Sequence, residues 1–285
     1  MEDQNTSFAK PRQVVEKIVA LIEEEGPLVT LRGHLKTFDP FIMFAEFAVL
    51  SPAGFPYHPH RGFEAVTYML EGAFCIQDRD GHKGVINEGD VQWMTAGRGT
   101  VHTETSAGDG ENIGVQLWIN LPSKDRMIKP AYKEIESKDI SQVESAGVVV
   151  RVIAGEAFGV RSPAYCQTPT MFLDFTLKPG ARVDQRIPEP WNAYVYVVAG
   201  EGVFGEPDAP SAARHHVLLL GGGEGVSVWN RSAEEPLRFL LFSGQPLEEP
   251  VVHKGPFVMS SQKEIEESFE DYRNCRNGFE KPEQV

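Results

Sequence analysis

The chain has 285 residues and a formal net charge of −14 at pH 7. This acidic balance disfavours direct binding to nucleic acid or to an anionic membrane, because both need a basic face. Hydrophobic residues make up 41% of the chain, enough for one large β domain or two compact domains. Its longest apolar runs are too short to form a membrane-spanning helix.

Cysteine usage and the start of the sequence indicate a reducing compartment. Cys75, Cys166 and Cys275 are odd in number and far apart, so they predict neither a disulfide framework nor a zinc ribbon. The polar start, MEDQNTSFAKPRQ, lacks the apolar core of a secretory signal. We therefore expect a soluble intracellular protein.

The chain opens with a polar lead, residues 1–12, which we expect to be disordered. The next segment, RQVVEKIVALIEEEG, is ambiguous, because its apolar residues fall at helical spacing while Val and Ile also favour strands. The run FIMFAEFAVL that follows is typical of a buried strand.

From residue 63 onward, short apolar runs such as AVTYML, FCIQ and VQWM alternate with turn signals such as EG, DRDGH and TAGRG. Strands interrupted this often predict an all-β barrel or sandwich. After a polar connection at residues 123–147, a second series of strands begins near residue 148.

The two series of strands form an approximate repeat. Gly72 in YMLEG aligns with Gly200 in YVVAG, and GDVQWMTAGRGTVHTE aligns with HHVLLLGGGEGVSVWN. Repetition at this scale predicts two duplicated barrels, residues 13–135 and residues 136–260.

The last segment, residues 261–285, predicts a helix and a short tail. Ser261 and Glu264 have the spacing of a capping box, and Gly278 suits the C-terminal cap. The apolar face expected for this helix consists of Ile265, Phe269, Tyr272 and Cys275.

Two short motifs suggest a metal site: His58 with His60, and His102 with Glu104. Residues i and i+2 of an extended chain share a face, so two such pairs on neighbouring strands would bring three imidazoles and a carboxylate together. This donor set suits Fe(II), Mn(II), Ni(II), Cu(II) or Zn(II). A lone HxH motif is more often surface or core histidine, but the later HxE in a glycine-punctuated, β-rich chain favours ligation.

The other histidines receive no ligand role. His215 and His216 are adjacent, so a strand would point them to opposite faces, and His253 is expected to be structural. The second half of the repeat offers no metal ligands at the aligned positions, which hold Arg186, Pro188, Val228 and Asn230. We therefore expect one metal per chain and a C-terminal barrel with a structural or interaction role.

Several segments together match a known family: FDPFIMFAEF, GFPYHPHRGFEAVTYMLEG, EGDVQWMTAGRGTVHTE, GVQLWINLPSKDRMIKPAY, GPFVMSS and NGFEK. They resemble the pirin family of the cupin superfamily, from about residue 38 to residue 281. The segments HPHRGFE and QWMTAGRG are specific to that family.

The resemblance implies an all-β fold of two cupin-type antiparallel barrels, a bicupin, with a C-terminal helix that packs on the N-terminal barrel. It also favours strands over a helix in RQVVEKIVALIEEEG. It implies one Fe(2+) per chain, with other divalent transition metals as alternatives, held in the N-terminal barrel by His58, His60, His102 and Glu104. Tyr57 and Ala45 depart from the Asp common at both positions in the family, which bears on substrate preference and partner surface.

The first function that the resemblance implies is quercetin (flavonol) 2,3-dioxygenase activity. A flavonol would bind through its 3-hydroxyl, Glu104 would act as catalytic base, and O2 would cleave the ring with release of carbon monoxide. Candidates for an apolar wall are Phe55, Trp93 and Trp118, although core packing suits the two tryptophans better. Candidates for orienting the imidazoles are Glu64 and Gln116, with surface or barrel-lining roles as the alternative.

The second function is that of an iron-dependent redox sensor and transcriptional coregulator, which would bind a transcription or signalling protein in one oxidation state. The resemblance then implies residence in the nucleus, the cytoplasm or both. We expect a monomer with no direct contact to nucleic acid or membrane.

Overall fold

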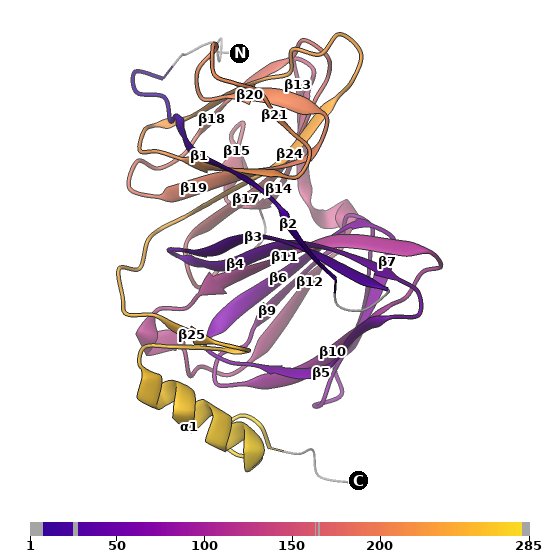
Figure 1. The fold of residues 1–285 in the computed structure, drawn as a ribbon, viewed down its shortest axis with the longest axis vertical. Coiled ribbons are helices and arrows are strands. Elements are labelled where there is room, and N and C mark those ends of the chain that lie inside the picture. Colours follow the sequence, from indigo (N-terminus) through magenta and orange to yellow (C-terminus); the bar gives the residue numbers. More distant parts are fainter. Residues whose placement is uncertain (1–7, 25–27, 163, 165, 281–285) are drawn as a thin grey trace. The chain divides into compact units, whose positions relative to one another are not determined.

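The computed structural model describes residues 8–24, 28–162, 164 and 166–280, and these ranges consist mostly of β-strands (Figure 1). The chain divides into two compact units. The N-terminal unit comprises Leu21–Asp139 and Leu247–Val285. The C-terminal unit comprises Met1–Ala20 and Ile140–Pro246.

The N-terminal unit is built from two antiparallel sheets. The larger has the strand order β12-β9-β6-β11-β4-β3-β2 and the smaller the order β5-β10-β7-β8. The strands are β2 (Leu21–Glu24), β3 (Val29–Phe38), β4 (Phe41–Leu50), β5 (Gly54–His60), β6 (Phe63–Glu71), β7 (Ala73–Asp78), β8 (Lys83–Asn87), β9 (Val91–Thr95), β10 (Thr100–Ser106), β11 (Glu111–Asn120) and β12 (Ala131–Ile135).

These two sheets face each other across a shared core. Phe47 and Met69 of the larger sheet pack with Phe74 and Ile76 of the smaller, and all four are buried. The rings of Phe47 and Phe74 are stacked, with centroids 4.9 Å apart. Side chains of this size each contribute about 1.5–3 kcal/mol when fully buried, which holds the sheets together as a barrel.

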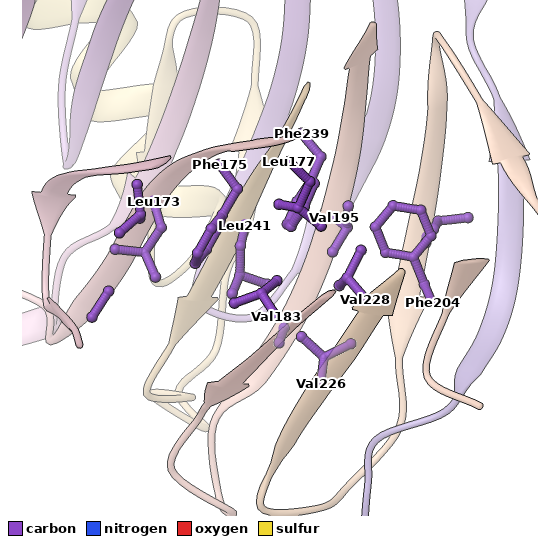
Figure 2. Close-up of a cluster of buried hydrophobic side chains, with 14 of the residues drawn as sticks. Leu173, Phe175, Leu177, Val183, Val195, Phe204, Val226, Val228, Phe239 and Leu241 are labelled. Carbon is purple, nitrogen blue, oxygen red and sulfur yellow. The ribbon is translucent and has the colours of Figure 1, made fainter. Parts of the chain in front are cut away.

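The C-terminal unit repeats this arrangement. Its sheets have the orders β1-β22-β19-β24-β17-β14-β13 and β18-β23-β20-β21, with a small β15-β16 hairpin. The strands are β1 (Val14–Val19), β13 (Ser141–Ser145), β14 (Val148–Ala154), β15 (Glu156–Ala157), β16 (Val160–Arg161), β17 (Thr170–Leu177), β18 (Arg182–Arg186), β19 (Asn192–Ala199), β20 (Glu201–Phe204), β21 (Ala212–Ala213), β22 (His216–Leu220), β23 (Gly225–Trp229) and β24 (Leu237–Gly244). Figure 2 shows Phe175, Phe239 and Leu241 of the larger sheet packing with Val183 and Val226 of the smaller.

The strand orders of the two units correspond position by position, as the sequence repeat predicts. The aligned strands β6 and β19 both occupy the third position of the larger sheet. Each is followed directly by a glycine in the left-handed region, Gly72 with φ 74° and Gly200 with φ 75°. Glycine adopts this conformation without the steric cost of a Cβ atom, which explains its presence at both positions.

The chain ends do not follow the predicted domain boundaries. The segment after Arg12 forms strands, as the family resemblance implies, but β1 pairs with β22 of the C-terminal unit, whereas β2 pairs with β3 of the N-terminal unit. In its own sheet, β1 fills the edge position that β12 fills in the other. The first barrel therefore begins at Leu21 rather than at residue 13.

Part of the predicted disordered lead is packed. Residues 1–7 lie outside the described residues. Phe8 and Arg12 are buried, and the Arg12 guanidinium donates hydrogen bonds to the carbonyls of Gly221 and Gly223, both at 3.0 Å. These contacts fix residues 8–12 on the C-terminal unit.

The C-terminal end of the chain belongs to the N-terminal unit. Residues 247–260, predicted as part of the second barrel, contain the hairpin of β25 (Val252–Lys254) and β26 (Phe257–Met259), which contacts the helix α1 (Gln262–Arg273) (Figure 1). This helix is too short to cross a membrane, and no other helix in the described ranges is long and apolar enough to do so.

The start of α1 has a variant of the predicted capping box, because the backbone N–H that bonds to Glu264 belongs to Ser260 rather than to the N-cap Ser261. Ser261 accepts a hydrogen bond from the backbone N–H of Glu264, and the Glu264 carboxylate accepts one from the N–H of Ser260. The helix ends earlier than the sequence suggests, because its C-cap is Asn274 and Gly278 follows four residues later. Residues 281–285, predicted as the tail, lie outside the described residues.

Candidate metal centre

The two histidine motifs lie on paired strands of the smaller sheet. His58 and His60 are on β5, His102 is on β10, and His58 stands directly opposite His102. One donor nitrogen from each of the three rings lies within 4.8 Å of the other two. The structure thus brings together the three imidazoles that the i, i+2 spacing predicts.

The spacing of these nitrogens fits a transition-metal ion. The Nε2 atoms of His58 and His102 are 3.1 Å apart. Two nitrogens bound to one ion at about 2.1 Å and at a right angle would stand about 3 Å apart. The Nδ1 atom of His58 lies 2.8 Å from the Pro56 carbonyl, so donation from Nδ1 leaves the Nε2 lone pair facing the centre.

The other two imidazoles are buried with nitrogens that lack hydrogen-bond partners in the described part of the chain. These atoms are both ring nitrogens of His60 and Nδ1 of His102. Buried polar atoms are normally paired, so unpaired nitrogens that converge with a third imidazole fit a bound cation. The three imidazoles therefore fit a divalent transition-metal ion.

The electrostatics of the centre favour the neutral form of His60 and His102. Burial lowers the pKa of His60 well below its usual value, and the neighbouring His102 and His58 act in the same direction. Burial and the charge of His58 lower the pKa of His102 to about 3. Neutral imidazole is the form that binds metals, so His60 and His102 are ready for ligation at neutral pH.

Glu104 lies beside the histidines, but its carboxylate is not part of the group of mutually close donor atoms. A register shift between His102 and Glu104 places Glu104 opposite Phe55. Its side chain is buried, and burial raises its pKa while the charge of His58 opposes that shift. Its role as a fourth ligand stays a prediction.

Two cross-strand neighbours hold this carboxylate. Thr67 on β6 stands opposite Gln116 on β11. The Thr67 hydroxyl donates to Oε1 of Glu104 at 3.3 Å, and the Gln116 amide donates to Oε2 at 3.4 Å. Gln116 therefore contacts the carboxylate rather than the imidazoles, and Ala45 is its partner on β4. Thr67 was not predicted, although it shares a strand face with Phe63, which packs on His60.

An aromatic group covers one side of His60. The ring centroids of Phe63 and Trp118 each lie 5.3 Å from that of His60, both edge-on. The Trp118 indole donates to Gln116 at 3.0 Å, which links the aromatic group to the Glu104 contacts. The exposed His253 packs edge-on against Trp118 at 5.6 Å, a contact that its isolated position in the sequence did not signal.

Three residues predicted to line the pocket or to orient the imidazoles lie elsewhere in the barrel. Phe55 lies on β5 and packs with Phe47 and Phe74 in the barrel core. Glu64 accepts a hydrogen bond from Thr95 at 2.9 Å and lies between Phe63 and Ala65, which face the barrel core. Alternation along β6 therefore turns Glu64 to the opposite face.

Trp93 lies on that same opposite face, because it pairs with Val66, two residues along β6 from Glu64. The structure thus leaves Glu64 and Trp93 away from the histidines. The sequence could not show this, because the face that a residue occupies depends on which neighbours contact the core.

The corresponding interior of the C-terminal unit is apolar. Val228, aligned with His102, pairs with Val183 rather than with Arg186, and both valines belong to the core in Figure 2. Asn230, aligned with Glu104, donates to the backbone carbonyls of Leu177 and Glu235. Among the described residues, the group of three close donors is that of His58, His60 and His102.

Two matching antiparallel barrels, one with converging histidines, define a bicupin with a candidate metal centre. Comparison with known proteins agrees: the pirin family model matches residues 23–119, and the model of the pirin C-terminal cupin domain matches residues 172–278. The chain is 55% identical over 282 residues to a pirin-like protein of Solanum lycopersicum, covering 97% of each chain. It is 46% identical over 252 residues to human pirin, covering 88% of this chain and 87% of the human one. The chain belongs to the pirin family.

A solved structure extends the comparison to a named enzyme. The crystal structure of a quercetin 2,3-dioxygenase from Acinetobacter baumannii is similar with a TM-score of 0.83 and 32% identity. The match covers 93% of this chain and 97% of that one, so it includes both barrels.

Proposed function

We propose that this protein is an iron-dependent dioxygenase that cleaves a flavonol such as quercetin. The observation that carries the proposal is the convergence of His58, His60 and His102, two of them buried with unpaired nitrogens, beside the buried carboxylate of Glu104. The similarity in fold and sequence to a quercetin 2,3-dioxygenase supports the substrate class.

In this proposal, Fe(II) is held by the three imidazoles and by Glu104. When bound, the ion supplies Lewis acidity toward the flavonol 3-hydroxyl and a route for electrons from the substrate to O2. Glu104 takes the hydroxyl proton as general base. Thr67 and Gln116 hold its two oxygens and so fix the direction from which it accepts the proton.

In this proposal, aromatic side chains beside the histidines would contact a planar aromatic substrate. Phe63 and Trp118 are stacked with centroids 4.2 Å apart and shield His60 from water. Phe55, which is half-buried on the strand that carries His58, offers a second apolar surface. Cleavage incorporates both atoms of O2 into the product while carbon monoxide leaves.

The experiment is oxygen uptake by the iron-loaded chain with quercetin, together with detection of carbon monoxide. The proposal predicts equal amounts of oxygen consumed and carbon monoxide released, with both lost in His58→Ala. Iron bound at one per chain without oxygen uptake would contradict the enzymatic proposal and leave the metal centre intact.

One observation favours a redox sensor as a second candidate function. The exposed His253 contacts Trp118, and Trp118 contacts His60, so an aromatic path leads from the surface to the centre. An oxidation-state signal could thus reach the β25–β26 hairpin and a transcription or signalling protein bound there. Hydrogen exchange of residues 252–259 should then differ between the Fe(II) and Fe(III) forms, and identical exchange would contradict this function.

A further inference from the structure

The side chain of Arg61 connects three distant segments of the N-terminal unit. Arg61 follows His60 directly and is only 2% exposed. Its Nε donates to the carbonyl of Arg98 at 2.7 Å, and Nη2 donates to the carbonyl of Asn277 at 2.7 Å. Nη1 donates to Asp271 of α1 at 3.0 Å. One guanidinium therefore links the end of β5 to the turn before β10 and to the C-terminal segment.

The C-terminal segment is shaped to receive this charge. Nη1 of Arg61 also donates to the Ser268 hydroxyl at 3.1 Å, and the Phe279 ring lies 4.6 Å from the guanidinium carbon. The second carboxylate oxygen of Asp271 accepts hydrogen bonds from Arg276 at 2.8 Å and from Asn277 at 2.9 Å. A buried charge is tolerated only when it is paired and hydrogen-bonded. Arg61 meets both conditions, because it forms an ion pair with Asp271 and donates hydrogen bonds from all three of its nitrogens.

The backbone around Arg61 is held by the same segment. The carbonyl of Arg61 accepts a hydrogen bond from Val258 at 3.0 Å, and its N–H donates to Pro256 at 3.3 Å. The next residue is Gly62, where a Cβ atom would lie 1.8 Å from the carbonyl oxygen of Val258. The backbone of Arg61 and Gly62 is thus held in place by its close contact with β26 and the residue before it.

The ring of His60 lacks the orienting hydrogen bond that the ring of His58 has. Neither of its ring nitrogens has a hydrogen-bond partner in the described residues, whereas Nδ1 of His58 bonds to Pro56. Ligating histidines are usually oriented by a hydrogen bond from the second ring nitrogen. His60 instead relies on packing against Phe63 and Trp118 and on the position of its own backbone.

The contact with Arg98 extends the support to the opposite strand. Arg98 lies in the turn between β9 and β10, four residues before His102. Within that turn, a Cβ atom on Gly99 would come within 2.8 Å of the Phe279 ring. The C-terminal segment therefore packs against the backbone that leads to His102 as well as the backbone that follows His60.

We propose that Arg61 is a positioning residue for the metal centre and that residues 256–279 form part of the support of that centre. The inference rests on the metal-binding function proposed above. Loss of a group that orients metal ligands typically lowers metal affinity by about 10–100-fold, so removal of the Arg61 contacts should fall in that range.

Arg126 provides a matched control. It is 1% exposed and also holds the C-terminal segment, donating to the Ser260 hydroxyl at 2.5 Å and to the Pro250 carbonyl at 3.4 Å. Its remaining donors bond to Leu121 and Asn120, so these hydrogen bonds involve neither β5 nor the turn before β10. Arg126→Lys loosens the same segment by the same chemical change without touching the ligand strands.

The test is anaerobic titration of the metal-free full chain with Co²⁺, followed by its visible absorption, for the wild type, Arg61→Lys and Arg126→Lys. Thermal unfolding of each metal-free variant measures the loss of stability. We expect Arg61→Lys to bind Co²⁺ at least tenfold more weakly, with an altered absorption spectrum, and Arg126→Lys to bind within twofold of the wild type. Asp271→Asn, which keeps Arg61, should also weaken Co²⁺ binding and serves if Arg61→Lys does not fold.

The outcomes separate the two proposals. A wild-type chain that binds no Co²⁺ would overturn the metal-binding function and this inference with it. A wild-type chain that binds Co²⁺ while Arg61→Lys and Asp271→Asn bind it equally well would overturn the role of Arg61 alone. Equal loss of affinity in Arg61→Lys and Arg126→Lys would also overturn it, because general loosening would then explain the effect.

Discussion

His58 and His102 stand opposite each other on paired strands with their Nε2 atoms 3.1 Å apart. Without a cation, two imidazole nitrogens at this distance can share one proton at most, in a single hydrogen bond. A divalent ion would be bound by both lone pairs, and the unpaired nitrogens of His60 lie close enough to complete the set. The geometry therefore couples metal binding to the stability of the N-terminal unit.

Metal binding should raise the thermal stability of the wild type and not of His60→Ala. A ligand that binds only the folded state at a hundred times its dissociation constant stabilises it by about 2.7 kcal/mol. Thermal unfolding with and without Fe(II), under anaerobic conditions, measures this difference. An equal increase in both proteins would mean that the ion binds elsewhere.

Glu104→Gln should fold, bind metal more weakly and lose turnover. The amide keeps the shape of the side chain but cannot accept the substrate proton, and general base catalysis typically contributes about 10²–10⁴-fold. Oxygen uptake with quercetin at saturating iron measures the loss. Thr67→Val, which removes one hydrogen bond to the carboxylate, serves as the milder comparison. Full turnover in Glu104→Gln would remove Glu104 from the mechanism.

Glu64→Gln should leave metal affinity within about twofold of the wild type, because Glu64 lies on the opposite face of β6 from the residues that contact the centre. Gln116→Leu removes a donor to Glu104 and should weaken turnover. Co²⁺ titration and oxygen uptake of the two variants make the comparison. A tenfold loss of affinity in Glu64→Gln would contradict the observed face assignment.

Asp271 should make the stability of the N-terminal unit depend on pH. Burial opposes its ionisation, but hydrogen bonds from Arg276, Arg61 and Asn277 outweigh burial and lower its pKa below 3.8. A depressed folded-state pKa stabilises the native protein above pH 3.8, and this contribution is lost as the pH falls through the folded-state value.

The comparison for this prediction is Asp271→Asn. At neutral pH the variant should lower the free energy of unfolding by about 2 kcal/mol, because the hydrogen bonds to a charged group are lost. The difference from the wild type should shrink as the pH is lowered from neutral to values below 3.8, toward the folded-state pKa of Asp271. Urea unfolding across this range measures it, and a difference that grows as the pH falls would contradict the sign of the shift.

The sequence predicts those parts of the molecule that depend on local spacing. The i, i+2 motifs brought His58, His60 and His102 to one centre, and the aligned glycines Gly72 and Gly200 marked the repeat. Local spacing does not say which distant strand a segment pairs with. The pairing of β1 with β22 in the C-terminal unit therefore became visible only in the fold.

Contacts across the sequence account for the remaining differences. Arg61 and Asp271 are separated by 210 positions, and no local pattern relates them. The placement of Glu64 and Trp93 away from the centre follows from the register of β6 and β9, which a single sequence does not contain.

The most direct test of the metal centre is the metal content of the chain, purified without oxygen and loaded with Fe(II), measured by mass spectrometry beside His60→Ala and His102→Ala. The three-histidine centre predicts one iron per wild-type chain and loss of that iron in both variants while the barrels stay folded. Iron retained in both variants, or absent from the wild type, would contradict it.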